Sequence, residues 1–481
     1  MTISNKYWLL LAFTFALFLG LRLHSLGNDI SNSDAARWHR RSIKFLEAIK
    51  TANYKETYQH YQPGVTLMWL DAINFQLNKS WPYLENSDEY VKINRQTQQL
   101  ITFTLFALLL LQTQLLRIMY GKRISLLYSF FIATEPYLLG IDRWVHLTSL
   151  ETYFGFTAML AFFVYINKKN PLLAILSGGL LALAVLSKLT SLIFAVFIII
   201  TCVVILRKRA IKPLLTIFTT FILVFVLLFP AFGAAPLEVG TNLLIAVTKA
   251  VGEDIRGQYF TGFKSLFYYP IILFFKLSAV TLFLAIMSLT NKKSPLWLKV
   301  FFSLLLVVLT LADKKIDRYS IILFPSIVLL AVFALNQLNT KLIALLLVTH
   351  FFILVFGIYK YSPVYSAFYS PISGSEQIAL KTGFYENSGE YFAQAAMYLN
   401  TKPRDEVVFI PNNYEAFSYF HKGKRTREFS PQVNYVVESV DFDRPISVGT
   451  YCNKLEKTFG PKGIPVVFVY SCQEVKPNPI S

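Results

Sequence analysis

The chain has 481 residues, of which 54% are hydrophobic and 15% are charged, and its formal net charge is +18. A soluble domain has about 25% charged residues, so this composition excludes an ordinary soluble protein and favours a membrane protein. The basic residues stand in short loops between apolar segments, which argues against a nucleic-acid-binding protein.

Apolar segments of roughly 16 to 22 residues, each about long enough to cross a hydrocarbon core, follow one another along the chain. No small-x-small cleavage site follows the first segment, so we interpret it as a retained helix and not as a signal peptide. The sequence predicts a polytopic α-helical membrane protein with about eleven transmembrane helices. These lie near residues 7–22, 99–119, 124–140, 150–166, 172–187, 190–206, 214–230, 268–290, 296–312, 319–335 and 342–359.

Basic residues mark alternate loops when the apolar segments are counted in order, and Asp and Glu are absent from these loops. Loops enriched in Lys and Arg stay in the cytoplasm. We therefore expect a multi-pass protein of the plasma membrane with a cytoplasmic N-terminus and an extracytoplasmic C-terminal domain. The loops contain Lys122-Arg123, Lys168-Lys169, Arg207-Lys208-Arg209 with Lys212, and Lys292-Lys293.

Two segments on the expected outer side are too long to be simple connections. In the first, residues 23–98, the stretch 33–46 is amphipathic, with Trp38 and Phe45 on one side at helical spacing. Residues 65–77 are apolar but too short to span, which predicts a helix at the membrane surface. Ordered loops of this length are usually functional. The second segment, 231–267, holds Glu238, Glu253, Asp254 and Arg256.

The long apolar segments end near residue 360. We predict a transmembrane domain over 1–360 and a small extracytoplasmic α/β domain over 361–481. Helical spacing over 388–400 predicts a helix, and the apolar runs at 406–410 and 464–470 predict strands. Cys452 and Cys472 lie in this domain, where a disulfide can form, but the sequence leaves their pairing open.

Asp34 is the first candidate for chemistry. Arg37, Arg40 and Arg41 follow it within two helical turns. A carboxylate beside basic side chains suits an enzyme that binds a phosphate and takes a proton from an acceptor. The residue types alone favour a simpler alternative, an ordinary solvated helix with Asp34 at its N-cap. No P-loop, GxGxxG, HExxH, CxxC or GxSxG motif is present, which disfavours an ATP-driven pump.

Further polar residues stand at the outer ends of the apolar segments. An ordinary turn at Gln62-Pro63-Gly64 and buried ion pairs are the simpler interpretations of these residues. Basic residues on the outer side nevertheless break the positive-inside trend, so either an anion such as phosphate or the nearby acids and lipid headgroups must balance them. The residues are His60, Glu135, Asp142, Arg143, His146, Glu151, Lys188, Arg318 and Tyr319.

Seven stretches, in this order, resemble the bacterial GT-C-fold glycosyltransferases of family 39, relatives of the dolichyl-phosphate-mannose protein mannosyltransferases and of the lipid A aminoarabinose transferases. The resemblance spans nearly the whole chain. Each motif is weak alone, but seven in order are specific. They are Asp34 to Trp38 with Arg40, Arg41 and Phe45; Gln62 to Leu70; Glu135 to His146; Leu186 to Lys188; Gln258 to Gly262 with Tyr269-Pro270 and Lys276 to Ser278; Lys315 to Pro325; and Tyr369 to Pro371 with Glu390 to Asn400.

The resemblance implies a polyprenyl-phosphate-linked sugar as donor and an acceptor hydroxyl on a protein, a glycan or a glycolipid, with transfer by inversion on the outer face. By matching position, Asp34 is the expected catalytic base. Basic side chains are expected to hold the departing lipid phosphate. The candidates for donor binding are Arg37, Arg40, His60, Arg143, His146, Lys188, Arg318 and Tyr319.

This chain departs from the family at two positions. Many relatives have a second Asp after the loop His, where this chain has Thr148; Glu151 or Asp142 is the candidate replacement. The family's His before Pro-Gly is Gln62 here, with His60 nearby. Both departures leave the donor sugar and a divalent metal ion open, and no cofactor is identified.

Two other classes remain as alternatives. A multi-spanning transporter would suit intramembrane charges, but no pair of matching halves is evident. A non-catalytic protein that kept the fold is the second alternative, and Thr148 is its best support.

Overall fold

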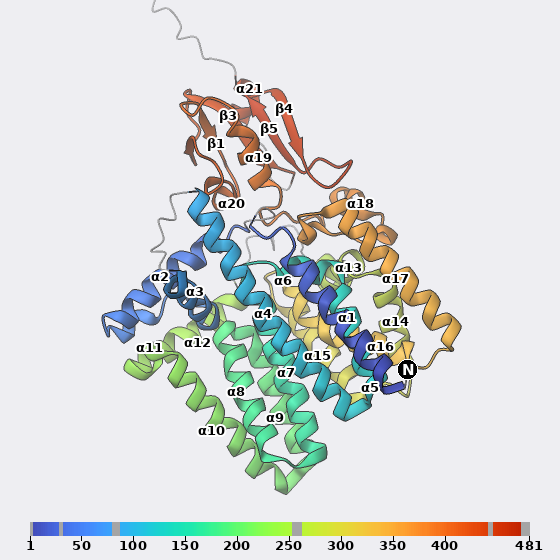
Figure 1. The fold of residues 1–481 in the computed structure, drawn as a ribbon. Helices are drawn as coiled ribbons and strands as arrows, with labels where there is room; N and C mark the ends of the chain where they lie inside the picture. Colours follow the sequence, from blue (N-terminus) through green and yellow to red (C-terminus); the bar gives the residue numbers. More distant parts are fainter. Residues whose placement is uncertain (1–2, 28–31, 79–86, 253–261, 441–445, 473–481) are drawn as a thin grey trace, which may run out of the picture.

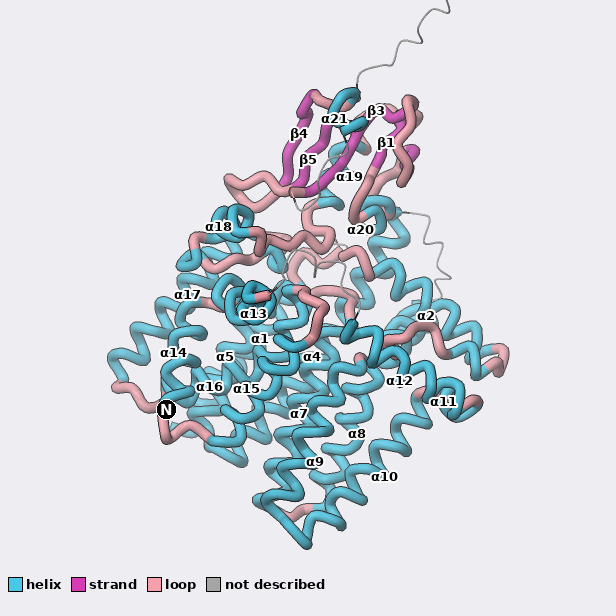
Figure 2. Tube along the Cα trace, turned by 180° about the vertical axis from the view of Figure 1, so that it is seen from behind, coloured by secondary structure: helices cyan, strands magenta, loops and turns pink. Residues whose placement is uncertain are grey.

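In the computed structural model, which describes residues 3–27, 32–78, 87–252, 262–440 and 446–472, a bundle of helices carries a small β-sheet domain at one end (Figures 1 and 2). Each predicted apolar segment folds as a helix or a pair of helices. The bundle consists of α1 (Ile3–Leu23), α4 (Ser87–Tyr120), α5 (Lys122–Thr134), α6 (Pro136–Asp142), α7 (Leu147–Lys168), α8 (Pro171–Ser187), α9 (Leu192–Leu206), α10 (Ile211–Leu228), α13 (Phe263–Lys276), α14 (Ala279–Thr290), α15 (Leu296–Leu311), α16 (Phe324–Leu335) and α17 (Thr340–Tyr361).

By length and composition, six helical segments of the described residues can cross a membrane, or seven if α5 and α6 form one span bent by 68°. Pro136 explains that bend, because a proline ring pushes the preceding residue into extended backbone, and Glu135 has φ −71° and ψ 114°. The number of spans, about eleven, therefore stays a prediction.

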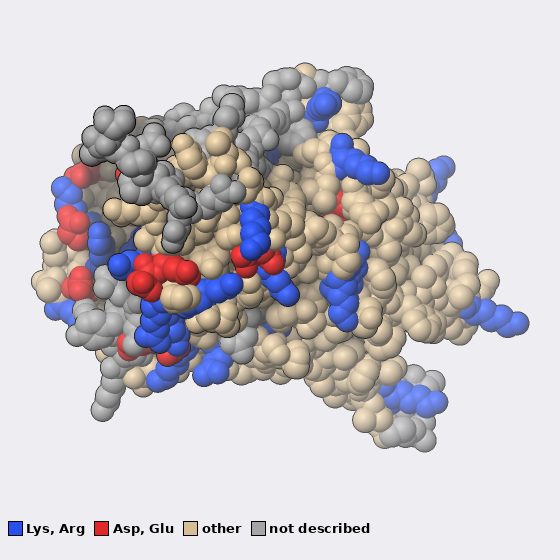
Figure 3. Space-filling view, turned by 90° about the horizontal axis from the view of Figure 1, so that it is seen from above, with Lys and Arg blue, Asp and Glu red and all other residues tan. Residues whose placement is uncertain are grey.

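The bundle is apolar on the outside as well as in the core. Helices α7 and α16 are almost completely buried, whereas α9, α10 and α17 expose large apolar side chains such as Val204, Leu223 and Phe352. Seen from the end that carries the sheet, charged side chains of both signs gather on one side, and much of the remaining surface is uncharged (Figure 3). An exterior this apolar would be unfavourable in water, whereas it suits the hydrocarbon interior of a bilayer. This is therefore a multi-pass membrane protein.

The turns between α7 and α8 and between α9 and α10 lie at the opposite end of the bundle from the sheet domain (Figure 1). These turns carry two of the predicted cytoplasmic basic clusters. The arrangement agrees with an extracytoplasmic sheet domain, and the orientation in the membrane stays a prediction.

The first long segment folds as the predicted pair of helices, α2 (Ala35–Lys50) and α3 (Val65–Asn78), joined through the 3-10 helix η1 (Tyr54–Thr57). Trp38, Ser42 and Phe45 are buried on one face of α2, as the spacing predicts. The helices α11 (Pro230–Ala234) and α12 (Pro236–Gly252) begin the second long segment. Its predicted charged residues Glu253, Asp254 and Arg256 lie outside the described residues, as do residues 258–261 of the matching motif.

The tail folds as the predicted α/β domain. Its mixed sheet has the order β2-β1-β3-β5-β4, in which β1 is parallel to β2 and β3 while β5 is antiparallel to β3 and β4. Cys452 and Cys472 are joined by a disulfide. The strands are β1 (Val407–Phe409), β2 (Lys424–Thr426), β3 (Val433–Ser439), β4 (Lys454–Phe459) and β5 (Val467–Ser471), and the helices are α18 (Ser375–Thr382), α19 (Phe392–Leu399), α20 (Tyr414–Ser418) and α21 (Ile446–Tyr451).

Residues 362–391 connect the two parts and pack directly on the end of the bundle. The Ser370 N–H donates to the carbonyl of Phe275 at 2.6 Å. Gly140 in α6 lies so close to this segment that a Cβ there would stand 2.2 Å from the Ser366 nitrogen. A side chain at position 140 would therefore push the tail away from the bundle.

Candidate functional site

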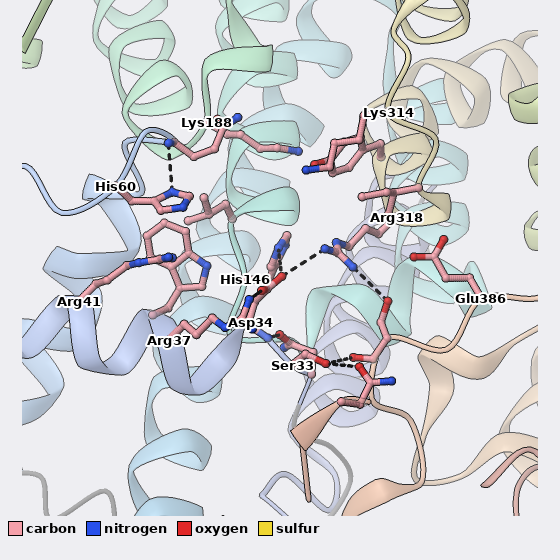
Figure 4. A pocket seen from close by; sticks show the side chains of 18 of the residues that line it. Ser33, Asp34, Arg37, Arg41, His60, His146, Lys188, Lys314, Arg318 and Glu386 are labelled. Carbon is pink, nitrogen blue, oxygen red and sulfur yellow. Dashed lines mark hydrogen bonds and ion pairs between the residues drawn. The ribbon is translucent and has the colours of Figure 1, made fainter. Parts of the chain in front are cut away.

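A cavity of about 380 Å³ lies where the end of the bundle, helix α2 and the tail meet (Figure 4). Among the described residues, five Lys and Arg but only two acids, Asp34 and Glu386, line it. Of the predicted site residues, the structure brings seven to this cavity from five separate stretches of the chain. They are Asp34, Arg37, His60, His146, Lys188, Arg318 and Tyr319.

Asp34 stands at the N-terminus of α2 and points into the cavity. Its side chain is 27% exposed and makes no capping hydrogen bond to its own helix. Instead, its carboxylate lies 3.2 Å from Arg318 Nη2, 3.5 Å from Arg37 Nη1 and 3.6 Å from His146 Nε2. Asp34 thus occupies the N-cap position of α2, as the simpler alternative has it, but its side chain faces the cavity and not the backbone of its own helix.

Burial alone would raise the pKa of Asp34. The contact with His146 and the charges of Arg318 and Arg37 outweigh burial and hold the pKa well below its ordinary value. Asp34 is therefore ionised at neutral pH. It is a weak base as long as Arg318 stays beside it, since an opposite charge stabilises the ionised form.

His146 is held in one tautomer. The backbone N–H of Thr148 lies 3.3 Å from Nδ1 of His146, and the Thr148 hydroxyl lies 2.9 Å from it. A backbone N–H can only donate, so Nδ1 is the acceptor and the proton sits on Nε2, facing Asp34. Burial lowers the pKa of His146 to about 4, so the ring is neutral and its Nε2–H faces the carboxylate of Asp34 at 3.6 Å. Thr148, the position that departs from the family, thus orients the imidazole.

Two of the cations at one end of the cavity, Arg41 and Lys314, lack carboxylate partners among the described residues. Figure 4 shows Lys314 facing Lys188 across this end, with Arg41 and His60 on the side of α2. Within the described parts of the chain, neither Arg41 nor Lys314 forms an ion pair. The Arg41 guanidinium lies over the Trp38 ring at 4.5 Å, and burial together with the like charge of Arg37 lowers its pKa without removing its proton at neutral pH. Such a cluster is suited to an anionic ligand.

The turn at Gln62-Pro63-Gly64 places His60 at this end of the cavity. Gly64 has φ +60°, and a Cβ there would meet the Trp38 ring at 2.2 Å, so only glycine lets the turn pack on α2. Nδ1 of His60 accepts from the Gln62 N–H at 3.1 Å. Burial and the charge of Arg41 lower the pKa of His60 to about 4, which keeps the ring neutral.

The charge of Lys188 is compensated by a carboxylate that lies outside the cavity. Its Nζ lies 2.9 Å from Glu151 Oε1 and 3.9 Å from the centre of the Tyr319 ring. Glu151 also accepts from the hydroxyls of Thr190 and Ser191, and its side chain is 2% exposed. This corrects the expectation that Glu151 is a second acid in the site, because its carboxylate is enclosed behind Lys188.

Three further predicted residues are turned away from the cavity. Arg143 is fully buried and donates to the carbonyls of Leu21 at 2.9 Å and His24 at 2.7 Å, at the end of α1. Asp142 pairs with Arg22 at 2.7 Å. These contacts correct the expectation that Arg143 holds a phosphate and that Asp142 acts as an acid.

Arg40, the third of these residues, lies on a different face of α2 from the cavity. Arg37 and Arg41 are four residues apart and share one face, whereas Arg40 is rotated by about 100° from Arg41. Its guanidinium pairs with Glu415 at 3.2 Å and with Tyr419 in the tail. Arg40 therefore ties α2 to α20 and does not reach the site, which corrects its assignment as a donor-binding residue.

The part of the site that the tail supplies was not predicted from the sequence. Asn32 and Ser33 at the start of α2 meet Glu386, Asn387, Ser388 and Asn413, so the end of the cavity nearest the tail is mostly uncharged. Lys314 belongs to the charged run Asp313 to Tyr319 that stands out in the sequence, but only Arg318 and Tyr319 of that run were expected to bind the donor. Among the described residues, no group of three or more His, Cys, Asp or Glu side chains is arranged to hold a metal ion.

The bundle, the basic cavity and the small tail domain together define a multi-pass membrane protein with the GT-C fold. ArnT from Cupriavidus metallidurans bound to undecaprenyl phosphate is similar, with a TM-score of 0.57 over 98% of this chain and 98% of that chain. The sequence identity is 11%. This likeness confirms, for the fold, the resemblance that the sequence motifs indicate.

A second similar structure is the archaeal oligosaccharyltransferase AglB from Archaeoglobus fulgidus, in complex with an inhibitory peptide and a dolichol-phosphate. Its TM-score is 0.50 at 11% identity, over 99% of this chain and 75% of that chain. No protein-family model matches the chain, and no curated protein matches it. At these identities the likeness concerns the fold alone.

Proposed function

We propose that this protein is a membrane glycosyltransferase that moves a sugar from a polyprenyl-phosphate donor to an acceptor hydroxyl on the outer face of the plasma membrane. The observation that carries the proposal is the carboxylate of Asp34, fixed by Arg318 and His146 inside a basic cavity of a GT-C fold. ArnT binds undecaprenyl phosphate, and AglB binds dolichol-phosphate. A protein, a glycan and a glycolipid remain the candidate acceptors.

In the proposed reaction, the acceptor oxygen attacks the anomeric carbon, and the bond from that carbon to the phosphate oxygen breaks. The acceptor proton passes to Asp34, and the polyprenyl phosphate leaves with the bonding electrons. This single displacement inverts the anomeric configuration. The donor arrives already activated by its phosphate, so the reaction needs no nucleotide.

Arg318 connects donor binding to the strength of the base. Its Nε is buried without a hydrogen-bond partner among the described residues, and its two other nitrogens contact Asp34 and Ser388. A phosphate beside Arg318 would share the positive charge that now stabilises the Asp34 carboxylate. The pKa of Asp34 would then rise toward a value better suited to a general base.

The test is sugar transfer or slow sugar release by the purified wild-type protein from a panel of radiolabelled polyprenyl-phosphate sugars. Consumption of one donor and not the others would support the enzyme class and identify the sugar. A monodisperse protein that neither binds nor consumes any donor would contradict the proposal and favour a transporter or a non-catalytic protein.

Replacing Lys314 or Arg41 by Gln is expected to raise the donor KM about tenfold and to change kcat little, because each change removes one charge-assisted contact to phosphate. The readout is the rate of transfer against donor concentration. Lys44→Gln, an exposed position on α2, is the matched control. If Lys314→Gln and Lys44→Gln have the same KM, the phosphate does not lie at this end of the cavity.

A further inference from the structure

One short piece of the tail reaches into the cavity and touches both sides of the central ion pair. The carbonyl of Ser388 accepts from the backbone N–H of Ser33 at 3.1 Å and from the Ser33 hydroxyl, also at 3.1 Å. The hydroxyl of Ser388 accepts from Arg318 Nη1 at 3.0 Å. Ser388 thus contacts the residue next to Asp34 on one side and the counter-ion of Asp34 on the other.

These contacts close a ring. Ser33 precedes Asp34 in the chain, Asp34 lies 3.2 Å from Arg318 Nη2, Arg318 donates to Ser388, and Ser388 accepts from Ser33. In such a ring, no member can move without stretching a contact elsewhere. The distance from the Asp34 carboxylate to the Arg318 guanidinium is therefore set partly by Ser388.

The tail holds Ser388 rigidly in turn. Its backbone N–H donates to Glu390 at 2.6 Å, and the other oxygen of that carboxylate accepts from Ser366 at 3.0 Å. Asn413, which precedes α20, accepts from the Ser33 hydroxyl at 2.5 Å and donates to the Asn387 carbonyl at 3.4 Å. The tail thus fixes the start of α2 from two separate stretches of sequence.

A purely structural role for the Ser388 hydroxyl is the alternative. The side chain is only half-buried, and the hydroxyl group contacts Arg318, which faces the cavity. The bonds that attach the tail to α2 run through the Ser388 carbonyl and through Asn413, and these remain when the hydroxyl is removed. Loss of the hydroxyl therefore releases Arg318 without releasing the tail.

We propose that Ser388 is a positioning residue, which holds Arg318 against Asp34 through its hydroxyl and holds the start of α2 through its carbonyl. Through this residue, the tail domain sets the geometry of the base. The inference rests on the proposed function, because it assigns Ser388 a part in the same transfer reaction.

The experiment compares Ser388→Ala and Ser388→Thr with the wild type, using the donor that the wild type consumes. Ser388→Ala is expected to lower kcat about tenfold, because a misplaced base and counter-ion lose their alignment, while the donor KM changes less than about twofold. Ser388→Thr keeps the hydroxyl and is expected to restore most of the rate. Ser373→Ala is the control, since the Ser373 hydroxyl bonds to the Ser370 carbonyl within its own turn at 2.7 Å.

The pH profile distinguishes positioning from general damage. In Ser388→Ala, Arg318 can move away from Asp34 and then stabilises the carboxylate less. The pKa of Asp34 therefore rises, and the acid limb of the kcat profile moves to higher pH. A Ser388→Ala variant with the kcat and pH profile of Ser373→Ala, beside an active wild type, overturns this inference and leaves the proposed function standing. A wild type that consumes no donor overturns both.

Discussion

Asp34→Asn is expected to abolish sugar transfer and to leave the protein folded in the membrane. Asparagine has nearly the same shape as aspartate, but its amide cannot take up the acceptor proton. Losing a general base costs about 10²- to 10⁴-fold in rate. The side chain makes no capping bond and faces the cavity, so α2 keeps its start without the charge. The measurement is transfer from the radiolabelled donor, beside thermal unfolding in detergent.

Glu47→Gln is the matched control for this prediction, because Glu47 is an exposed carboxylate on the same helix. It should transfer sugar at the wild-type rate. If Asp34→Asn retains the wild-type rate, Asp34 is not the base, and another group takes the acceptor proton. If Asp34→Asn fails to accumulate in the membrane, the aspartate serves the fold, and its contacts with Arg318 and His146 are structural.

The sequence alone predicted the apolar helices of the bundle and most of the charged side chains that line the cavity. Spans are recognisable because an apolar run of about 20 residues matches the thickness of the hydrocarbon core. Asp34, His146 and Lys188 were found because each stands at an outer helix end, where the short connections hold side chains at one level of the membrane. The turn before α3 was predictable for a similar reason, since Gly64 permits a backbone that other residues avoid.

The sequence could not decide which way neighbouring side chains point. Arg40 and Arg41 are adjacent, yet one pairs with the tail and the other lines the cavity. Arg143 and His146 share one short loop, but Arg143 turns back to cap α1. The direction of each side chain depends on how helices that are distant in the sequence pack together. Residue type and spacing alone do not determine it.

The contribution of the tail was missed for a related reason. Ser388 and Asn413 are common turn residues in a part of the chain without an apolar pattern, and they reach the site only when the sheet domain docks on α2. Strands β2 and β3 were also missed, and so was β4. It is an edge strand with Lys and Glu between its apolar residues, so it lacks the apolar run that revealed β1 and β5.

Glu151→Gln is expected to destabilise the protein strongly. Glu151 and Lys188 form a buried pair, with side chains 2% and 5% exposed. Removing one partner of a buried pair leaves the other charge uncompensated, at a cost of about 3 to 5 kcal/mol. Thermal unfolding in detergent should show a clear drop in the unfolding temperature. Glu238→Gln is the control, because its pair with Lys55 is about half-exposed on both sides and water screens the attraction between the two charges.

The double variant Glu151→Gln with Lys188→Met distinguishes two roles for Glu151. One is a structural role as the counter-ion of Lys188, and the other is a catalytic role as the second acid of the site. Removing both charges removes the uncompensated lysine, so much of the lost stability should return. Transfer should not return, since the donor phosphate would still lack Lys188. If Glu151 acts instead as the second acid of the site, Glu151→Gln should lower kcat and unfold at the same temperature as Glu238→Gln. That result would mean that the carboxylate reaches the cavity during turnover, past the lysine that now encloses it.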